Sequence, residues 1–334
     1  MPDEAALKRR AQEVLGRPLE RVRRITDTTQ FMALSRGDVL DLEDRQYLIT
    51  GVAYEGRFGL DEEPKHWVKR ALDLGDGSQK LIKLVFFEEF DLPIGSLRVR
   101  CFRSPRKEAR ILALVKGMPA FMQGITLYDD ARNEVRVLER IPGGSMDRKL
   151  DTLRLDHPTY FETRLRTVLT KFMGCLEAIA FLHGQGERHG DIRRDHIFEH
   201  SGDGSWIWID FDYNFELAES PFGLDLFGLG NVLCYLAGRG IPTLPALKRE
   251  RPEALERLDT GDLSLVIPNR VFNLKKLYPY LPDGLNRVLM HFSAASPVYY
   301  ERVEEIIADL RPVLDQLPGP AEPSPAQNAQ GGQP

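Results

Sequence analysis

The sequence is poor in the features that mark secreted, membrane-spanning or nucleic-acid-binding proteins. Its 334 residues include only 3 cysteines, far apart and without metal-type spacing, so we expect unpaired thiols that serve as small core residues in a reducing compartment. No run approaches the roughly 18 apolar residues of a membrane helix, and the N-terminus has no apolar signal-peptide core. The net charge of -5 creates no overall basic field. We therefore expect a cytoplasmic protein whose partners include neither nucleic acid nor a membrane.

What the chain does contain is typical of a globular protein, with 42% hydrophobic and 28% charged residues. A helix is expected over residues 4–15, and short apolar runs between turn signals predict strands from residue 22 to 102, with a hairpin at residues 75–77. Ser104 as N-cap and Pro105 in the first turn begin a predicted helix over residues 104–116. A second hairpin is expected over residues 121–141.

Beyond residue 142 the pattern becomes helical. The spacing predicts one long helix over residues 160–183, a buried strand over 206–210, a buried helix over 222–238 and a last helix over 300–317. The fold class is therefore α+β, with a β-rich lobe followed by a helical lobe. The expected boundaries are an N-terminal extension at 1–44, the two lobes at 45–141 and 142–317, and a disordered tail at 318–334.

The most specific chemistry lies in two acidic motifs. His189-Gly190-Asp191 follows the long helix, and the buried strand ends in Asp210 within IDFDYN. Alone, either motif is a weak signal. Their order, with a helix before the first and a buried strand before the second, makes both stronger.

This arrangement resembles the catalytic loop and the metal-binding motif of the protein kinase superfamily, in particular bacterial serine/threonine kinases. The resemblance covers residues 45–312 and implies a bilobal kinase fold that uses ATP and Mg²⁺, or Mn²⁺. It implies that Asp191 is the catalytic base, that Asp210 is the metal ligand and that Arg193 lies beside the transferred phosphate.

The resemblance extends backwards to the nucleotide site. Lys83 matches the lysine that holds the phosphates, and Glu108 matches its helix partner. Three apolar residues and two hinge positions match the adenine site; they are Val68, Ala71, the gatekeeper Leu138, and the backbones of Glu139 and Ile141. Asp225 matches the aspartate that supports the catalytic loop.

The chain departs from the family pattern at several points. His196 stands where the family has a metal-binding asparagine, so the resemblance assigns it to the metal together with Asp210. Mg²⁺ prefers oxygen ligands, and the adjacent Asp195 is the alternative ligand. The glycine-loop positions, counted back from Val68, fall on LDEEPKHW with acidic Asp61, Glu62 and Glu63, whereas Gly51, Gly56 and Gly59 could form the turn only in longer strands. Asp212 replaces the glycine of the metal motif, which implies a more fixed loop or an extra carboxylate near the metal.

Only fifteen residues separate Asp210 from Asp225, so there is little room for a full activation segment. The first interpretation is an ATP-dependent phosphotransferase like the serine/threonine protein kinases, with a protein substrate. The alternatives are a small-molecule kinase resembling the aminoglycoside phosphotransferases, which the short segment favours, and a pseudokinase that binds or scaffolds, which His196 and the acidic loop favour.

Overall fold

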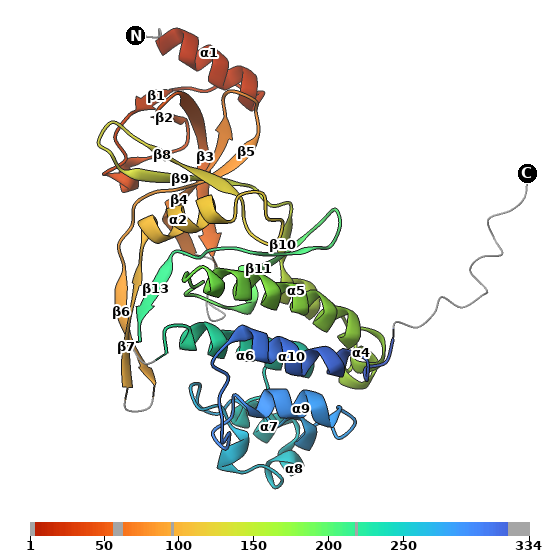
Figure 1. Cartoon of the computed structure of the whole chain (residues 1–334). Helices are drawn as coiled ribbons and strands as arrows, with labels where there is room; N and C mark the ends of the chain where they lie inside the picture. Colours follow the sequence, from red (N-terminus) through yellow and green to blue (C-terminus); the bar gives the residue numbers. More distant parts are fainter. Residues whose placement is uncertain (1–3, 56–62, 95–96, 218–219, 320–334) are drawn as a thin grey trace, which may run out of the picture. The chain divides into compact units, whose positions relative to one another are not determined.

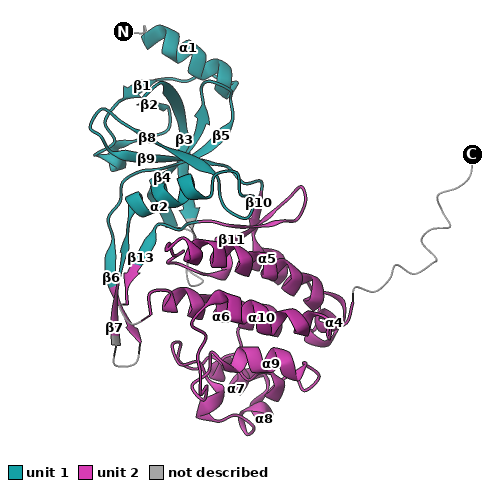
Figure 2. Ribbon diagram, viewed as in Figure 1, with its two compact units in different colours: residues 1–90, 101–142, 210–214 teal, residues 91–100, 143–209, 215–334 magenta. Residues whose placement is uncertain are grey.

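The computed structural model describes residues 4–55, 63–94, 97–217 and 220–319. Internal contacts divide the chain into two compact units (Figure 2). Unit 1 comprises residues 1–90, 101–142 and 210–214, and unit 2 comprises residues 91–100, 143–209 and 215–334. The expected tail lies outside the described residues from residue 320 onward, and the four expected domain boundaries stay a prediction.

Unit 1 is built on a seven-stranded sheet in the order β1-β2-β3-β4-β5-β9-β8 (Figure 1). Its strands are β1 Arg23–Ile25, β2 Asp38–Leu42, β3 Arg45–Glu55, β4 Glu63–Asp73, β5 Gln79–Lys83, β8 Gly124–Tyr128 and β9 Glu134–Glu139. Only the β1–β2 pair is parallel, and the other neighbours run antiparallel. The sheet thus begins within the stretch that the sequence suggested as an extension.

The two hairpins expected from turn signals are present. Strands β4 and β5 pair directly, with Val68 opposite Lys83, and their turn contains Gly77 at a φ of 75°. A left-handed φ suits glycine because it lacks a Cβ atom. Strands β8 and β9 form the second hairpin. Adjacent pairing of consecutive strands explains why local turn chemistry predicted this part of the sheet.

Apolar side chains pack on the sheet in two clusters. The main cluster contains Leu40, Tyr47, Ile49, Ala71, Ile82, Val135 and Val137 among its buried members. A smaller cluster joins helix α1, Glu4–Leu15, to the sheet through Leu7 and Ala11, which pack with Val39 and Leu48. Arg9 on the other side of α1 is exposed, whereas Arg10 Nε donates to the Leu74 carbonyl at 3.0 Å, so the charged residues do not all face away from the sheet.

Helix α2, Pro105–Leu114, is the one helix expected between the strands of this unit. The Ser104 hydroxyl accepts a hydrogen bond from the Lys107 amide at 3.3 Å, which satisfies one of the unpaired donors at a helix start. The helix packs against β8 and β9. Its first turn carries Glu108, so the N-cap sets the position of that carboxylate.

Unit 2 is mainly helical. Its helices are α3 Met146–Asp151, α4 His157–Thr163, α5 Leu165–Gly184, α6 Gly223–Gly238, α7 Leu244–Glu250, α8 Pro252–Leu255, α9 Asp283–Met290 and α10 Val303–Leu314. Helix α5 packs against α6 and α10 (Figure 1). Helix α6 is buried on nearly every side, as its continuous apolar sequence predicted. The fold-class prediction, a β-rich part followed by a helical part, is confirmed.

The single helix expected over residues 160–183 is wrong at its start. Arg164 has φ -130° and ψ -34°, so its backbone leaves the helical region and separates α4 from α5. The regular apolar spacing begins only at Leu165, while Tyr160 packs separately and its hydroxyl donates to the Leu236 carbonyl at 3.0 Å. The stretch over residues 160–183 is therefore two helices rather than one.

Two three-stranded sheets complete the fold, in the orders β10-β11-β12 and β13-β7-β6. Their strands are β10 Gly143–Ser145, β11 Ile197–His200, β12 Trp206–Trp208, β13 Tyr213–Glu216, β7 Leu97–Arg103 and β6 Glu89–Ile94. Strand β12 ends before Asp210, whose φ is 65°. The three cysteines are free and buried, as expected. Among the described residues, no helix has both the length and the apolar character needed to cross a membrane.

A buried carboxylate joins the first residues of the sheet to the β8–β9 turn. Asp129 accepts hydrogen bonds from the amide and hydroxyl of Thr28, both at 2.7 Å, and from the amide and side chain of Asn133 at 2.8 and 2.9 Å. Burial raises the pKa of Asp129, but these four donors outweigh burial, and the pKa lies below its ordinary value. Asp129 therefore favours the folded state when it is ionised.

Replacing Asp129 with asparagine is expected to lower the free energy of unfolding at pH 7 by about 1–3 kcal/mol, because an amide cannot accept from all four donors. A depressed folded pKa contributes stability above the unfolded pKa of about 3.9, and that contribution is lost as the pH falls through the folded pKa. The difference between wild type and variant should therefore shrink below about pH 4. Urea unfolding across this pH range measures it, with exposed Asp130→Asn as control; a difference independent of pH would contradict the assignment.

Candidate active site

Lys83 lies at the centre of a cluster of buried charges in unit 1. It is at the end of β5, and its Nζ lies 2.7 Å from Glu108 Oε1 and 2.6 Å from Asp210 Oδ1. The Glu108 side chain has no exposed surface, the Lys83 side chain is 5% exposed, and the Asp210 side chain is 15% exposed. The structure thus brings together three of the residues that the sequence suggested for one site.

Glu108 is held from both sides. Its second carboxylate oxygen, Oε2, accepts from Arg136 Nε at 3.1 Å. Arg136 lies directly opposite Lys83 in the β5–β9 pairing and also donates to the Leu84 carbonyl. The sheet register therefore places two cations beside one carboxylate of α2.

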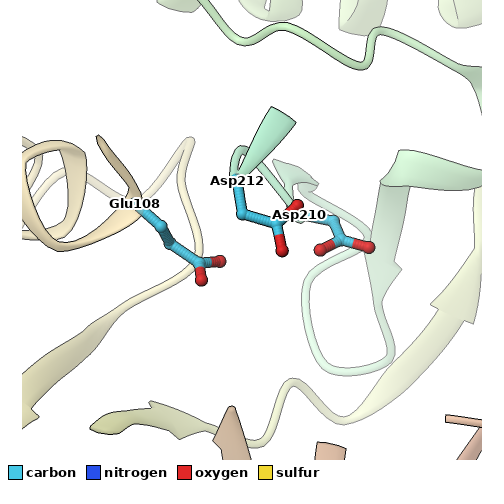
Figure 3. Close-up of side chains that lie close together, drawn as sticks. All are labelled: Glu108, Asp210 and Asp212. Atoms are coloured by element: carbon cyan, nitrogen blue, oxygen red, sulfur yellow. The ribbon is translucent and has the colours of Figure 1, made fainter. Parts of the chain in front are cut away.

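A third carboxylate, Asp212, joins the cluster from the segment before β13. Its Oδ2 lies 3.0 Å from Lys83 Nζ and 2.7 Å from Arg103 Nη1. Figure 3 shows the side chains of Glu108, Asp210 and Asp212 gathered at one place, the first from α2 and the other two from the same short segment. The sequence pointed to Asp212 as an unusual residue, but not to its partner Arg103.

The charges in this cluster stabilise one another. Burial lowers the pKa of Lys83, but Asp210, Asp212 and Glu108 outweigh it and raise the pKa above its ordinary value. Burial raises the pKa of Asp212, and repulsion by Asp210 adds to this, yet Lys83 and Arg103 bring its pKa below the ordinary value. At neutral pH the lysine is therefore cationic and Asp212 is anionic.

The face of the sheet that carries Lys83 also carries part of the expected adenine site. Val68 lies opposite Lys83, and Leu138 lies opposite Leu81 on the same face. Ala71 is three residues from Val68, so it points to the other face, where it packs in the main core cluster. The register does not bring Ala71 together with Val68, and it places Leu81 on the face of Lys83 instead.

The two hinge positions behave differently from each other. Glu139 is the last residue of β9 and is exposed, and its amide donates to the Gln123 carbonyl at 2.9 Å. Ile141 follows the strand and is half-buried. The carbonyl of Glu139 and both backbone groups of Ile141 are the parts of this segment that could contact a planar base.

The expected glycine-loop stretch LDEEPKHW belongs in part to a strand, since β4 begins at Glu63 and contains residues 63–67, while β3 extends to Glu55. Gly56, Gly59, Asp61 and Glu62 fall within residues 56–62. Gly51 is inside β3, under the guanidinium of Arg70. The strands are longer than the sequence indicated, and residues 56–62 lie outside the described residues.

Unit 2 holds the second set of expected site residues, on the loop between α5 and β11. Asp225, in the first turn of α6, accepts from the amide of His189 at 2.7 Å and from the amide of Gly190 at 2.8 Å. It also lies 3.0 Å from His183 Nε2, at the end of α5. Asp225 thus holds the backbone just before Asp191, in the supporting role that the resemblance implied.

Three expected site residues lie together on this loop, namely Asp191, Arg193 and His196. The Asp191 side chain is 19% exposed, and Arg193 Nη1 lies 3.8 Å from its Oδ2. Arg193 Nε donates to Asp195 Oδ1 at 3.0 Å. Burial raises the pKa of Asp195, but Arg193 and His196 bring it below the ordinary value. The Arg193 guanidinium is therefore oriented by an ionised neighbour, as a group that binds phosphate requires.

His196 is buried, and its Nδ1 lies 2.9 Å from the Asp191 carbonyl oxygen and 3.6 Å from Asp191 Oδ2. A carbonyl only accepts hydrogen bonds, so the Nδ1 atom is assigned the proton. His196 thereby positions the backbone of Asp191. Its expected role as a metal ligand stays a prediction, since it and Asp210 belong to different units.

The carboxylates near Lys83 are suited to a hard divalent cation such as Mg²⁺, which prefers oxygen donors. The oxygens of Glu108, Asp210 and Asp212 lie within 4.8 Å of one another. Glu108 and Asp212 are each bound by an arginine as well as Lys83, and Asp210 is bound by Lys65 at 3.3 Å as well as Lys83. Asp210 is the most exposed of the three, with 15% of its side chain accessible. Asp210 is thus the residue of this cluster that fits a metal ligand best.

The order of the elements is now complete: a β-rich part with a lysine–glutamate pair, then an acidic loop after a long helix, then an aspartate after a buried strand. This is the order of elements that the resemblance to protein kinases implied. The Lys83–Glu108 pair lies within unit 1, and the loop that carries Asp191 lies within unit 2.

Solved structures of kinase domains are among those similar to this chain. No protein-family model and no curated protein sequence matches it. The PknI kinase domain of Mycobacterium tuberculosis is 16% identical over 84% of this chain and all of that chain, with a TM-score of 0.49. Rad53 residues 1–466 in complex with AMP-PNP are 14% identical over 80% of this chain and 64% of that chain, with a TM-score of 0.48. The identities are too low to transfer an activity.

Sequence reasoning missed Arg103, Arg136 and Leu81. Leu81 could have been found because it is two residues before Lys83 on the same strand and so shares its face, and Arg136 by aligning the neighbouring strand opposite Lys83. Arg103 stands one residue before the predicted N-cap Ser104, a place where no helix periodicity applies. Only the folded chain shows that it pairs with Asp212.

Proposed function

We propose that this chain transfers the γ-phosphate of ATP to a hydroxyl group. The observation that supports this best is Lys83, whose ammonium is held by Glu108 and Asp210 at 2.7 and 2.6 Å. Phosphoryl transfer depends mainly on positioning and on neutralising negative charge, and a positioned lysine beside a metal-type carboxylate supplies both. Burying several charges lowers the stability of a fold, so a cluster of this kind supports a functional site.

The proposal assigns a role to each residue of the candidate site. Glu108 orients Lys83, which binds the phosphates of the nucleotide. Asp210 would hold Mg²⁺ or Mn²⁺, which supplies charge neutralisation on the phosphate oxygens when bound. Asp191 accepts the proton of the attacking hydroxyl, and Arg193, oriented by Asp195, stabilises the transferred phosphate. Val68, Leu138 and the backbones of Glu139 and Ile141 contact the adenine.

The acceptor hydroxyl belongs to a protein or to a small molecule. A protein acceptor follows from the resemblance to serine/threonine kinases. A small-molecule acceptor is favoured by the short segment between Asp210 and Asp225, in which residues 213–216 form strand β13. Little chain remains there for a platform that binds a peptide.

A pseudokinase is the candidate from a different class. It is favoured by Asp212, since three carboxylates already surround Lys83 where a nucleotide would need it. Binding a nucleotide then requires Lys83 to exchange a carboxylate for phosphate oxygens. Nucleotide binding without transfer would support this candidate.

The test is transfer of the γ-phosphate from ATP by purified protein with Mg²⁺ or Mn²⁺. Asp191→Ala is expected to lower turnover about 10²-fold, because a general base contributes at least this much. Asp203→Ala is the matched control, since Asp203 lies in an exposed turn of the same unit. Turnover unchanged in Asp191→Ala would remove Asp191 from the mechanism, and nucleotide-dependent thermal shift reports binding separately.

A further inference from the structure

Three residues at the end of β7 and the start of α2 contact the segment that carries Asp210. Arg103 Nη1 binds both oxygens of Asp212, at 2.9 and 2.7 Å. The Ser104 amide donates to the Asp212 carbonyl at 2.7 Å, and Lys107 Nζ donates to the Tyr213 carbonyl. Backbone and side chain of Asp212 are therefore both attached to the corner between β7 and α2.

The Arg103 guanidinium is itself held on all sides. Its side chain is 2% exposed, Nε donates to Glu88 Oε2 at 3.0 Å, and Nη2 donates to the Tyr213 hydroxyl at 2.9 Å. Its plane lies over two rings, with the central carbon 4.1 Å from the Tyr213 centroid and 5.3 Å from the Trp67 centroid. A guanidinium fixed in this way binds one carboxylate orientation in preference to others.

Without Arg103, Asp212 would keep Lys83 as its nearest cation in the cluster. A buried carboxylate attracts a nearby ammonium strongly, and Lys83 also forms ion pairs with Glu108 and Asp210. Arg103 neutralises Asp212 and so weakens the attraction between Asp212 and Lys83. The lysine is then able to exchange a contact for the phosphates of a nucleotide.

We propose that Arg103 is a positioning residue of this site: it binds Asp212 and thereby keeps the Asp210 segment and helix α2 together around Lys83. Its catalytic meaning rests on the proposed function. In protein kinases the lysine–glutamate pair and the metal-binding aspartate must both be in place, and phosphorylation often controls this. Here the Arg103–Asp212 pair holds both in the unmodified chain.

Hydrogen exchange of the protein without nucleotide tests the proposal. In Arg103→Met, peptides that span residues 104–109 and 211–217 are both expected to exchange about tenfold faster or more, because a broken buried pair frees both segments. Arg103→Lys keeps the charge and should recover part of the protection. Arg100→Met is the matched control, since Arg100 is on the same strand and pairs with Glu216 at the surface. Faster exchange in only one segment, or an equal effect in the control, overturns the proposal.

The double variant Arg103→Met, Asp212→Asn covers the case in which the single variant does not fold. Removing both partners leaves no buried unpaired charge, so the double variant should fold, but both segments should still exchange faster than in wild type because the pair that joins them is gone. Wild-type protection of both segments in the double variant would overturn the proposal. In turnover assays, Arg103→Met should raise the KM for ATP and Arg103→Lys should partly restore it. A wild type that transfers no phosphate, with the exchange result intact, would overturn the proposed function and leave the positioning of the Lys83 cluster by Arg103 standing.

Discussion

Replacing Asp210 with asparagine is expected to lower the rate of phosphate transfer about 10³-fold or more. A bound divalent ion contributes several kcal/mol by neutralising charge on the phosphate oxygens, and each 1.36 kcal/mol is tenfold in rate. Asp210 is the most exposed carboxylate of its cluster and fits the metal best. Asparagine keeps an oxygen but loses the charge, so the metal and its contribution are expected to be lost together.

The measurement is turnover of labelled ATP at saturating Mg²⁺, together with thermal shift by nucleotide with and without metal. Wild type should show a shift that increases with metal, and Asp210→Asn should not. Asp76→Asn, in the exposed β4–β5 turn of the same unit, controls for a general loss of charge. If Asp210→Asn retained turnover and its response to metal, Asp210 would not be the metal ligand and the proposed mechanism would be wrong.

Replacing Glu108 with alanine is expected to lower the free energy of unfolding by about 3–5 kcal/mol. Its side chain is fully buried and lies between Lys83 and Arg136, each within 3.1 Å of one of its oxygens. Alanine would remove a carboxylate from two buried cations and leave a cavity between them. Glu108→Gln should cost less, because an amide oxygen still accepts one hydrogen bond.

Denaturant unfolding of the purified variants measures this effect. Glu177→Ala is the control, because Glu177 pairs with Arg311 in an exposed ion pair of the kind that contributes about 0–1 kcal/mol. A change of less than about 1 kcal/mol in Glu108→Ala would mean that the two cations find other partners. The pair would then be less important for the fold of unit 1 than its burial indicates.

Local signals predicted the elements that depend on neighbours in sequence. The N-cap at Ser104, the glycine turn at Gly77 and the apolar surface of α6 were all foreseen, because each depends on residues a few positions apart. The break at Arg164 was missed because both flanking stretches are helical and no glycine or proline marks the boundary between α4 and α5.

The residues of the candidate site were likewise predicted only in part. Lys83, Glu108 and Asp210 were each identified from the sequence, and the structure brings them together. Ala71 was assigned to the face of Val68, although an offset of three residues in a regular strand leads to the opposite face. Strand pairing therefore corrected a residue that motif matching had misplaced.

The sequence by itself determined where many of the strands and helices form and which residues carry most of the acidic, basic and apolar groups of the candidate site, because these follow from short-range spacing and side-chain chemistry. Only the tertiary structure decided which cation neutralises which carboxylate. Arg103 and Asp212 are 109 positions apart, and Lys83 and Asp210 are 127 apart. Such pairs form because burial removes water from the charges, and burial is a property of the packed chain rather than of any segment.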